Sequence, residues 1–157
     1  MKNHLIPPDK RVRVISEVLL VDDNTGDTEL ISQLLKKTGW SPHTYSVSDG
    51  VEAMAFLRRI GKYSRAPRPH LVLLDLNMPR KNGWTVLVEA KTDVTLKTIP
   101  IVVFTTSETM LDAERCYELG ANSYVSKPGN LEIYTSTVTT IGDYWFGIAS
   151  LEHREEE

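Results

Sequence analysis

The sequence contains a single cysteine, Cys116, so no disulfide bond can form within the chain. A lone thiol fits a reducing compartment such as the cytoplasm. No apolar run approaches the roughly 20 residues that a membrane-spanning helix needs. The opening stretch, MKNHLIPPDKRVRV, has no continuous apolar segment of the kind found in signal peptides. We therefore expect a soluble cytoplasmic protein without membrane attachment.

A strong excess of either charge is also missing. The 157 residues carry a formal net charge of −3, with a pI of about 5.8, and no basic cluster is evident. Because a nucleic-acid-binding surface is normally basic, we expect no direct contact with DNA or RNA. Hydrophobic residues make up 41% of the chain and charged residues 25%, which is ordinary for a globular domain with one core.

The two ends of the chain differ in composition from the middle. Residues 1–16 contain Pro7, Pro8 and mixed charges, and residues 148–157 include the polar run LEHREEE. These compositions predict an N-terminal tail over 1–16, one domain over 17–147 and a C-terminal tail over 148–157. After Trp145 too few residues remain for a DNA-binding output domain.

Short apolar runs alternate with segments of helical spacing between the predicted tails. Nearly continuous apolar runs are typical of strands buried on both faces of a parallel sheet. Strand and helix patterns repeated five times indicate a doubly wound (βα)₅ sheet of the α/β class. The five predicted strands are Val18–Val21, His43–Val47, Leu71–Leu74, Ile101–Phe104 and Ser123–Val125.

The helical segments carry start signals and apolar stripes. Asp49 is a candidate N-cap of the second helix, and the last helix begins near Asn130. An apolar stripe at helical spacing predicts the buried face of that last helix. It consists of Leu131, Tyr134, Val138, Ile141 and Trp145.

Polar residues gather where the predicted strands end. Asp22 and Asp23 follow the first strand, Asp75 the third and Thr105 the fourth, and Lys127 follows the fifth. Functional sites of such sheets lie at the carboxyl ends of the strands. Taken singly, each residue also fits a plain role in a turn, a helix cap or a strand end. Their joint placement after four strands indicates a functional site.

The chemistry of this set is that of phosphoryl transfer. Neighbouring carboxylates repel unless a cation neutralises them, and oxygen ligands suit Mg²⁺. A carboxylate can attack a phosphoryl group while the metal ion offsets the charge on the transferring oxygens. A lysine and a hydroxyl could also bind those oxygens and offset their charge.

Four motifs resemble the receiver domains of two-component response regulators: VLLVDDN, LVLLDLNMPRKNG, IPIVVFTTS and SYVSKP. They occur in receiver order over about residues 17–146. The resemblance implies a flavodoxin-like fold with strand order 2-1-3-4-5 and Mg²⁺-dependent phosphorylation by a sensor histidine kinase. It also implies a phosphoacceptor with intrinsic self-phosphorylation and self-dephosphorylation chemistry rather than an enzyme.

The resemblance assigns roles residue by residue. Pro79 and Gly83 match the turn after the phosphorylated loop, where glycine tolerates a conformation that other residues resist. The remaining matches are Asp75 as phosphoacceptor, Asp22, Asp23, Asp75 and the main-chain carbonyl of Asn77 as Mg²⁺ ligands, Thr105 and Tyr124 as the switch pair, and Lys127 as the family's lysine.

One subfamily is similar in further segments. Four segments resemble the response regulators that partner cyanobacterial and bacterial phytochromes. They are LVEAKTDVTLKTIPIVVFTTS, SYVSKPGNL, the aromatic end DYWF and the polar insertion Gly61–His70. The usual form of that subfamily is a lone receiver. The resemblance implies a phytochrome kinase as the partner.

The signalling surface is expected on the fourth helix, the fifth strand and the fifth helix, where it would also form a homodimer. Trp145 and Phe146 are adjacent and cannot face one direction on a helix, so we expect one of them on an exposed face. Most apolar and aromatic residues of this surface could instead fill the core, and for Leu119 and Tyr134 the core is the preferred interpretation. The predicted dimer and output residues are Met110, Tyr117, Tyr134, Trp145 and Phe146.

Three other functions compete with this interpretation. A phosphatase of haloacid-dehalogenase type needs a second Asp two residues after the nucleophile, where this chain has Asn77. A flavin-binding module needs a phosphate loop after the first strand, and the acidic DDNTGDTE would repel the FMN phosphate. A receiver fold that acts only as a phosphorylation-independent interaction module stays open, and phosphate uptake from acetyl phosphate would distinguish it.

Overall fold

The computed structural model describes residues 15–107 and 109–152. Most of the predicted tails, residues 1–14 and 153–157, lie outside this range. The domain boundaries at 17 and 147 therefore stay predictions. No helix in the described part is long and apolar enough to cross a bilayer.

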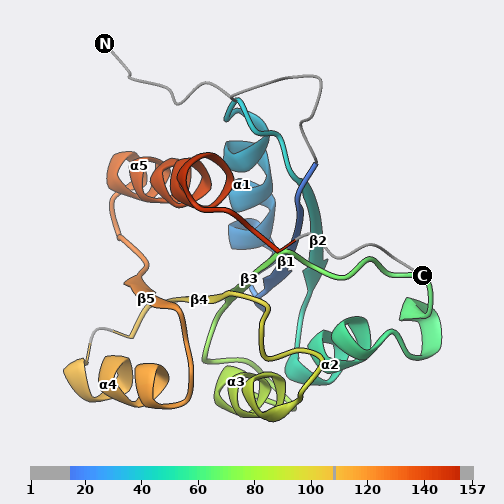
Figure 1. Ribbon diagram of the computed structural model, residues 1–157. Helices are drawn as coiled ribbons and strands as arrows, with labels where there is room; N and C mark the ends of the chain where they lie inside the picture. Colours follow the sequence, from blue (N-terminus) through green and yellow to red (C-terminus); the bar gives the residue numbers. More distant parts are fainter. Residues whose placement is uncertain (1–14, 108, 153–157) are drawn as a thin grey trace.

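Five parallel strands form one sheet in the order β2-β1-β3-β4-β5, which confirms the predicted fold class and strand order. Helices α1 and α5 cover one face, and α2, α3 and α4 lie on the other (Figure 1). The strands are β1 Glu17–Val21, β2 His43–Val47, β3 Leu71–Leu74, β4 Ile101–Thr105 and β5 Ser123–Ser126. The helices are α1 Thr25–Lys36, α2 Gly50–Arg58, α3 Gly83–Thr92, α4 Met110–Glu118 and α5 Leu131–Gly142, with a 3₁₀ turn at Gly61–Tyr63 and a π-helical turn at Asp143–Ile148.

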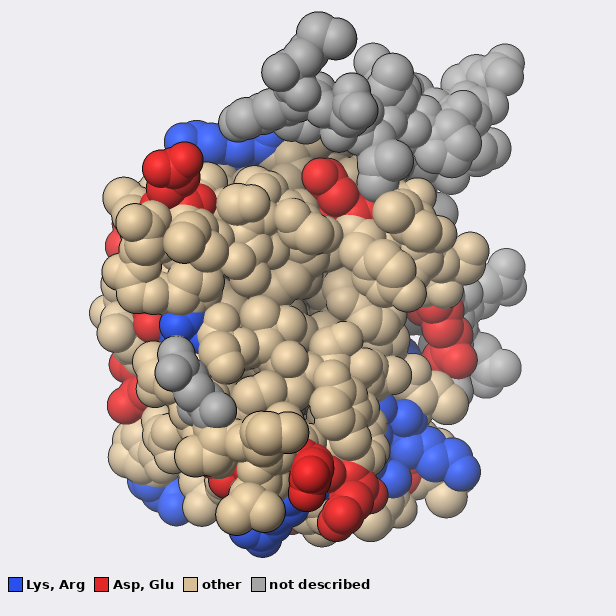
Figure 2. Space-filling view, turned by 90° about the vertical axis from the view of Figure 1, so that its left-hand side faces the viewer, with Lys and Arg blue, Asp and Glu red and all other residues tan. Residues whose placement is uncertain are grey.

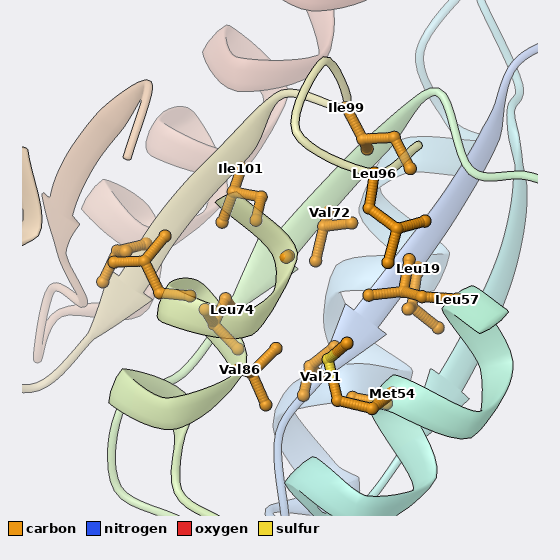
Figure 3. Packing of buried hydrophobic residues seen from close by; sticks show 14 of the residues in the cluster. Leu19, Val21, Met54, Leu57, Val72, Leu74, Val86, Leu96, Ile99 and Ile101 are labelled. Atoms are coloured by element: carbon orange, nitrogen blue, oxygen red, sulfur yellow. The ribbon is translucent and has the colours of Figure 1, made fainter. Parts of the chain in front are cut away.

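Successive side chains of a strand point to opposite faces of the sheet, so a hydrophobic core forms on each face. In β3, Val72 and Leu74 face α2 and α3, whereas Leu71 and Leu73 face α1 and α5. Figure 3 shows the first of these cores, where side chains of the central strands meet Met54 and Leu57 of α2 and Val86 of α3. Because β1, β3 and β4 are covered on both faces, their sequences are almost continuously apolar.

All five α-helices begin with a side chain that caps a backbone N–H of the first turn. Asn or Asp caps four of them and Thr the fifth, as expected for residues whose oxygen accepts a bond at this position. The predictions of Asp49 and Asn130 as helix starts are confirmed. The five caps are Asn24, Asp49, Asn82, Thr109 and Asn130.

The C-terminal helix corrects part of the predicted output surface. Tyr134 is only 6% exposed, and its ring packs 5.5 Å from that of Phe104, so its placement on the surface was wrong. It lies in the core with Val138 and Ile141, as its place in the apolar stripe indicates. Leu131, at the start of the same stripe, is exposed.

The aromatic end of α5 also differs from expectation. Trp145 and Phe146 are both partly buried against the core under α1 and α5, so neither is the exposed aromatic that was predicted. The exposed aromatic is Tyr144, whose ring meets that of Trp145 edge-on at 5.2 Å. The chain here forms a π-helical turn, closed by a 2.7 Å bond from the N–H of Ala149 to the carbonyl of Tyr144. A wider turn rotates successive side chains by less than an α-helix does, which lets both rings reach the core.

Candidate functional site

Three carboxylates meet at the carboxyl ends of two neighbouring strands. Val21 of β1 pairs with Leu74 of β3, so the residues that follow them, Asp22 and Asp75, lie side by side. Oxygen atoms of Asp22, Asp23 and Asp75 lie within 4.8 Å of one another. Asp22 and Asp75 are buried and Asp23 is exposed. The sequence analysis predicted this cluster because the three residues follow the ends of predicted strands.

A lysine from the end of β5 neutralises part of this charge. Nζ of Lys127 donates to Asp22 at 2.5 Å and lies 4.0 Å from a carboxylate oxygen of Asp75. Burial alone would lower the pKa of Lys127, but the carboxylates around it outweigh burial and raise it. Burial raises the pKa of Asp22, and the hydrogen bond from Lys127 offsets this only in part. The lysine is thus held in its charged form at the edge of the sheet.

A fourth carboxylate, Asp27, was missed by the sequence analysis. It lies in the first turn of α1, where its Oδ2 accepts a 3.0 Å bond from Lys127 and its Oδ1 a 3.3 Å bond from the hydroxyl of Tyr134. Its position four residues after Asp23, at the start of a predicted helix, was the available signal. Three carboxylates, those of Asp22, Asp27 and Asp75, therefore lie within 4.0 Å of one ammonium group.

Thr105 brings a buried hydroxyl to the same edge. It is the last residue of β4 and is 0% exposed, and its carbonyl accepts a 2.7 Å bond from the N–H of Lys127. Within the described part of the chain, its Oγ1 has no hydrogen-bond partner. Leaving a buried hydroxyl unpaired costs about 1–3 kcal/mol, and the group would be satisfied by an oxygen-rich ligand at this edge.

Tyr124 ties β5 to the loop that follows β4. Its hydroxyl donates to the carbonyl of Ser107 at 2.6 Å, and its N–H donates to the hydroxyl of Tyr117 at 3.1 Å. The ring is partly buried against the core under α2 and α3. Thr105 and Tyr124 therefore lie on either side of one short loop, and their roles as a switch pair stay a prediction.

The loop between β3 and α3 passes close to Asp75. Asn77 lies in this loop and is exposed, and the N–H of Gly83 donates to the carbonyl of Leu76 at 2.9 Å. A Cβ on Gly83 would lie 2.1 Å from the carbonyl oxygen of Asp75. Close backbone approach explains this glycine, rather than the unusual turn conformation that we expected from the sequence. The residue of the loop with a left-handed backbone is Arg80, with φ of 63°.

The predicted output surface is largely uncharged. Figure 2 shows the side of the molecule formed by α4 and α5, where charged residues lie mainly around the edge and the middle lacks them. Met110 and Tyr117 are exposed as expected, and Leu111 of α4, Ile133 of α5 and Tyr144 add exposed apolar area that the sequence analysis did not name.

The donor set at the strand ends fits a divalent metal ion. Every oxygen offered by Asp22, Asp23 and Asp75 is a hard ligand, and a cation would relieve the repulsion among them. The buried hydroxyl and the lysine point to an anionic partner beside that cation. An acidic cluster beside a buried lysine and a buried hydroxyl, at the carboxyl edge of a 2-1-3-4-5 sheet, is the arrangement expected of a receiver domain.

The chain belongs to the response regulator receiver domain family, whose model matches residues 18–139. It is 41% identical to response regulator Rcp1 of Synechocystis sp. over 134 residues, which are 85% of this chain and 91% of that protein. A cyanobacterial phytochrome response regulator among the solved structures confirms the resemblance to phytochrome-associated regulators.

Solved structures agree with this assignment. The phosphorylated cyanobacterial phytochrome response regulator RcpA matches with a TM-score of 0.86 and 41% identity, covering 89% of this chain and all of that one (100%). The Mn²⁺-bound form of Rcp1 matches with a TM-score of 0.85 and 40% identity, covering 88% of this chain and 99% of that one. Mn²⁺ in that relative and the Asp cluster of this chain both fit a divalent-metal site.

Proposed function

We propose that this chain accepts a phosphoryl group on Asp75 from a sensor histidine kinase in the cytoplasm, in a reaction that depends on Mg²⁺. The observation that carries the proposal is the meeting of Asp22, Asp23 and Asp75 with the ammonium group of Lys127 and the unpaired hydroxyl of Thr105. A metal ligand set, a nucleophile and two groups for phosphoryl oxygens share one strand edge.

Each residue has a distinct part in the reaction. Asp22, Asp23, Asp75 and the main-chain carbonyl of Asn77 would hold Mg²⁺, which offsets the charge of the transferring oxygens when it is bound. A carboxylate oxygen of Asp75 bonds to phosphorus as the bond to the donor's nitrogen or oxygen breaks, giving an acyl phosphate. Lys127 then pairs with a phosphoryl oxygen, and the hydroxyl of Thr105 donates to another.

The signal would leave the site through Tyr124. Movement of the Thr105 hydroxyl toward the phosphoryl group pulls on the loop that Tyr124 holds through Ser107. The tyrosine ring then repacks, which changes the face formed by α4, β5 and α5. The same largely uncharged face suits a homodimer interface, with Met110 and Tyr117 exposed and with Trp145 and Phe146 partly buried after α5.

The expected partner is a phytochrome kinase. The identity to Rcp1 and the likeness to RcpA support this, because RcpA is a cyanobacterial phytochrome response regulator. Direct contact with nucleic acid forms no part of the proposal, since the net charge is −3.

The test is the intact mass of the protein after incubation with acetyl phosphate. The wild type should gain one phosphoryl group in the presence of Mg²⁺ and none when EDTA removes the metal. Asp75→Asn, which keeps the size of the side chain but not its nucleophile, should gain none under either condition. A wild type without the adduct would contradict the proposal and favour a phosphorylation-independent interaction module.

A further inference from the structure

The loop between β2 and α2 is hydrogen-bonded to the middle of the loop between β3 and α3. Asp49, which is 7% exposed, uses its two carboxylate oxygens for different partners. Oδ1 accepts a 2.9 Å bond from the N–H of Glu52 and so caps α2, whereas Oδ2 accepts a 3.0 Å bond from the guanidinium of Arg80. The cap belongs to α2 itself, but the second bond reaches the loop that carries Asn77.

The backbones of the two loops are also in contact. The N–H of Gly50 donates to the carbonyl of Lys81 at 2.8 Å. A Cβ on Gly50 would lie 2.2 Å from that carbonyl oxygen, so only glycine allows this approach. Lys81 in turn pairs with Glu89 of α3 at 2.7 Å. The loop after Asp75 is thus fixed on both sides at positions 80 and 81.

Arg80 adopts a backbone conformation that is unfavourable without support. Its φ of 63° lies in the left-handed region, which residues other than Gly, Asn and Asp rarely occupy. Such conformations persist where the surroundings hold them. Here the ion pair with Asp49 and the hydrogen bond from Gly50 to Lys81 stabilise the left-handed backbone of Arg80.

The metal ligand proposed in this loop is a main-chain group. The carbonyl of Asn77 is oriented only by the path of the backbone, since no rotation of its side chain can aim it. The backbone path between Asp75 and Gly83 is fixed by three hydrogen bonds. The N–H of Gly83 donates to the carbonyl of Leu76, and nearer the middle of the loop Arg80 donates to Asp49 and Gly50 donates to Lys81. A looser loop would present the carbonyl over a wider range of directions, and Mg²⁺ tolerates little departure from octahedral geometry.

We propose that Asp49 and Arg80 are positioning residues for the metal site, and that their ion pair holds the β3–α3 loop in the form that binds Mg²⁺. The inference rests on the proposed function and adds a second loop to the phosphorylation machinery. Neither residue touches the metal or the reacting atoms, so both act through the backbone of residues 77–81.

The separate oxygens of Asp49 allow the two roles to be tested apart. Asp49→Asn keeps an oxygen to cap α2, because Asn and Asp are equally good N-caps, but removes the charge that attracts Arg80. Arg80→Asn removes the cation and keeps a residue that tolerates the left-handed backbone. Lys62→Asn is the matched control, because it breaks an ion pair with Glu52 of the same helix without touching the β3–α3 loop.

The measurements are the Mg²⁺ affinity of the full chain, followed by tryptophan fluorescence, and the initial rate of phosphorylation by acetyl phosphate as Mg²⁺ is varied. Asp49→Asn and Arg80→Asn should each weaken Mg²⁺ binding about three- to tenfold, since outer groups that orient metal ligands exert effects of this order or larger. Saturating Mg²⁺ should restore the rate. The double variant should be no weaker than either single variant, because both remove one interaction.

Unchanged Mg²⁺ affinity in both single variants would overturn the inference, as would effects that add in the double variant or an equal loss in Lys62→Asn. A wild type that binds Mg²⁺ and is phosphorylated upholds the proposed function in each of these cases. Absence of both in the wild type would overturn the proposed function and the inference together.

Discussion

Thr105 shows how one residue serves the strand and the site at once. Its branched side chain suits the end of β4, and four apolar residues precede it in that strand. Its hydroxyl, however, is buried without a partner in the described part of the chain. The sequence identifies the residue, but the unmet hydrogen bond is visible only once β4 is enclosed by its neighbours.

Replacing Thr105 by Val should separate stability from signalling. Val keeps the branched shape and removes the unpaired hydroxyl, so we expect the free energy of unfolding to stay the same or rise by about 1 kcal/mol. Urea denaturation measures this. The variant should still take a phosphoryl group on Asp75 but lose the phosphorylation-dependent change in self-association or tryptophan fluorescence. A clear loss of stability would mean that the hydroxyl already has a partner.

Among the elements, the strands and the helix starts follow closely from the sequence. Each predicted strand agrees with the observed one to within a residue at either end, and the agreement is easiest to explain for β1, β3 and β4, which are buried and almost continuously apolar. The end of α5 does not follow, since the α-helical period assumed up to Trp145 gives way to a π-helical turn at Asp143. Tyr134 was assigned both to the buried stripe and to the output surface, and its spacing to Val138 and Ile141 already favours the buried face.

The exposed face of α4 should control self-association. Leu111 is 77% exposed on α4, so Leu111→Glu puts a charge on the proposed interface without disturbing the core. We expect the dimer to weaken by about tenfold or more, because an unpaired charge at an interface is costly. Sedimentation velocity with and without phosphorylation measures the effect.

Val94 provides a matched control for that experiment. It is 76% exposed, almost the same as Leu111, but lies after α3 rather than on α4. Val94→Glu should leave the association constant unchanged. Equal weakening by both substitutions, or by neither, would contradict an interface on the α4–β5–α5 face.

For the molecule as a whole, the motifs predict the site better than its surroundings. Asp22, Asp75 and Lys127 follow strands whose order is fixed by the fold, so their meeting could be foreseen. The contact of Asp27 with Lys127 depends on the direction in which α1 leaves β1. The pair of Asp49 and Arg80 depends on two loop conformations that no periodic pattern encodes.

Cys116 offers a probe of the whole fold. It is 0% exposed, and burial raises its pKa from the ordinary 9.0 to about 11. The unfolded thiol therefore ionises at lower pH than the folded one. Its contribution to stability is fully present below about pH 9 and is lost as the pH rises toward about 11, by at most about 3 kcal/mol.

Denaturation at several pH values measures that loss, and Cys116→Ala should remove this part of the pH dependence. In the native protein at neutral pH, a thiol reagent should react only as fast as the protein opens, and urea should make the reaction rapid. Rapid labelling of the native protein would show that α4 opens without global unfolding.

Lys127 and Asp22 are partners across 105 positions of the chain. A ribosome must therefore make almost the entire domain before the lysine can reach the carboxylates. A chain that ends before Lys127 contains the acidic residues but lacks the cation that pairs with them. We therefore expect incomplete chains to lack the proposed phosphorylation site.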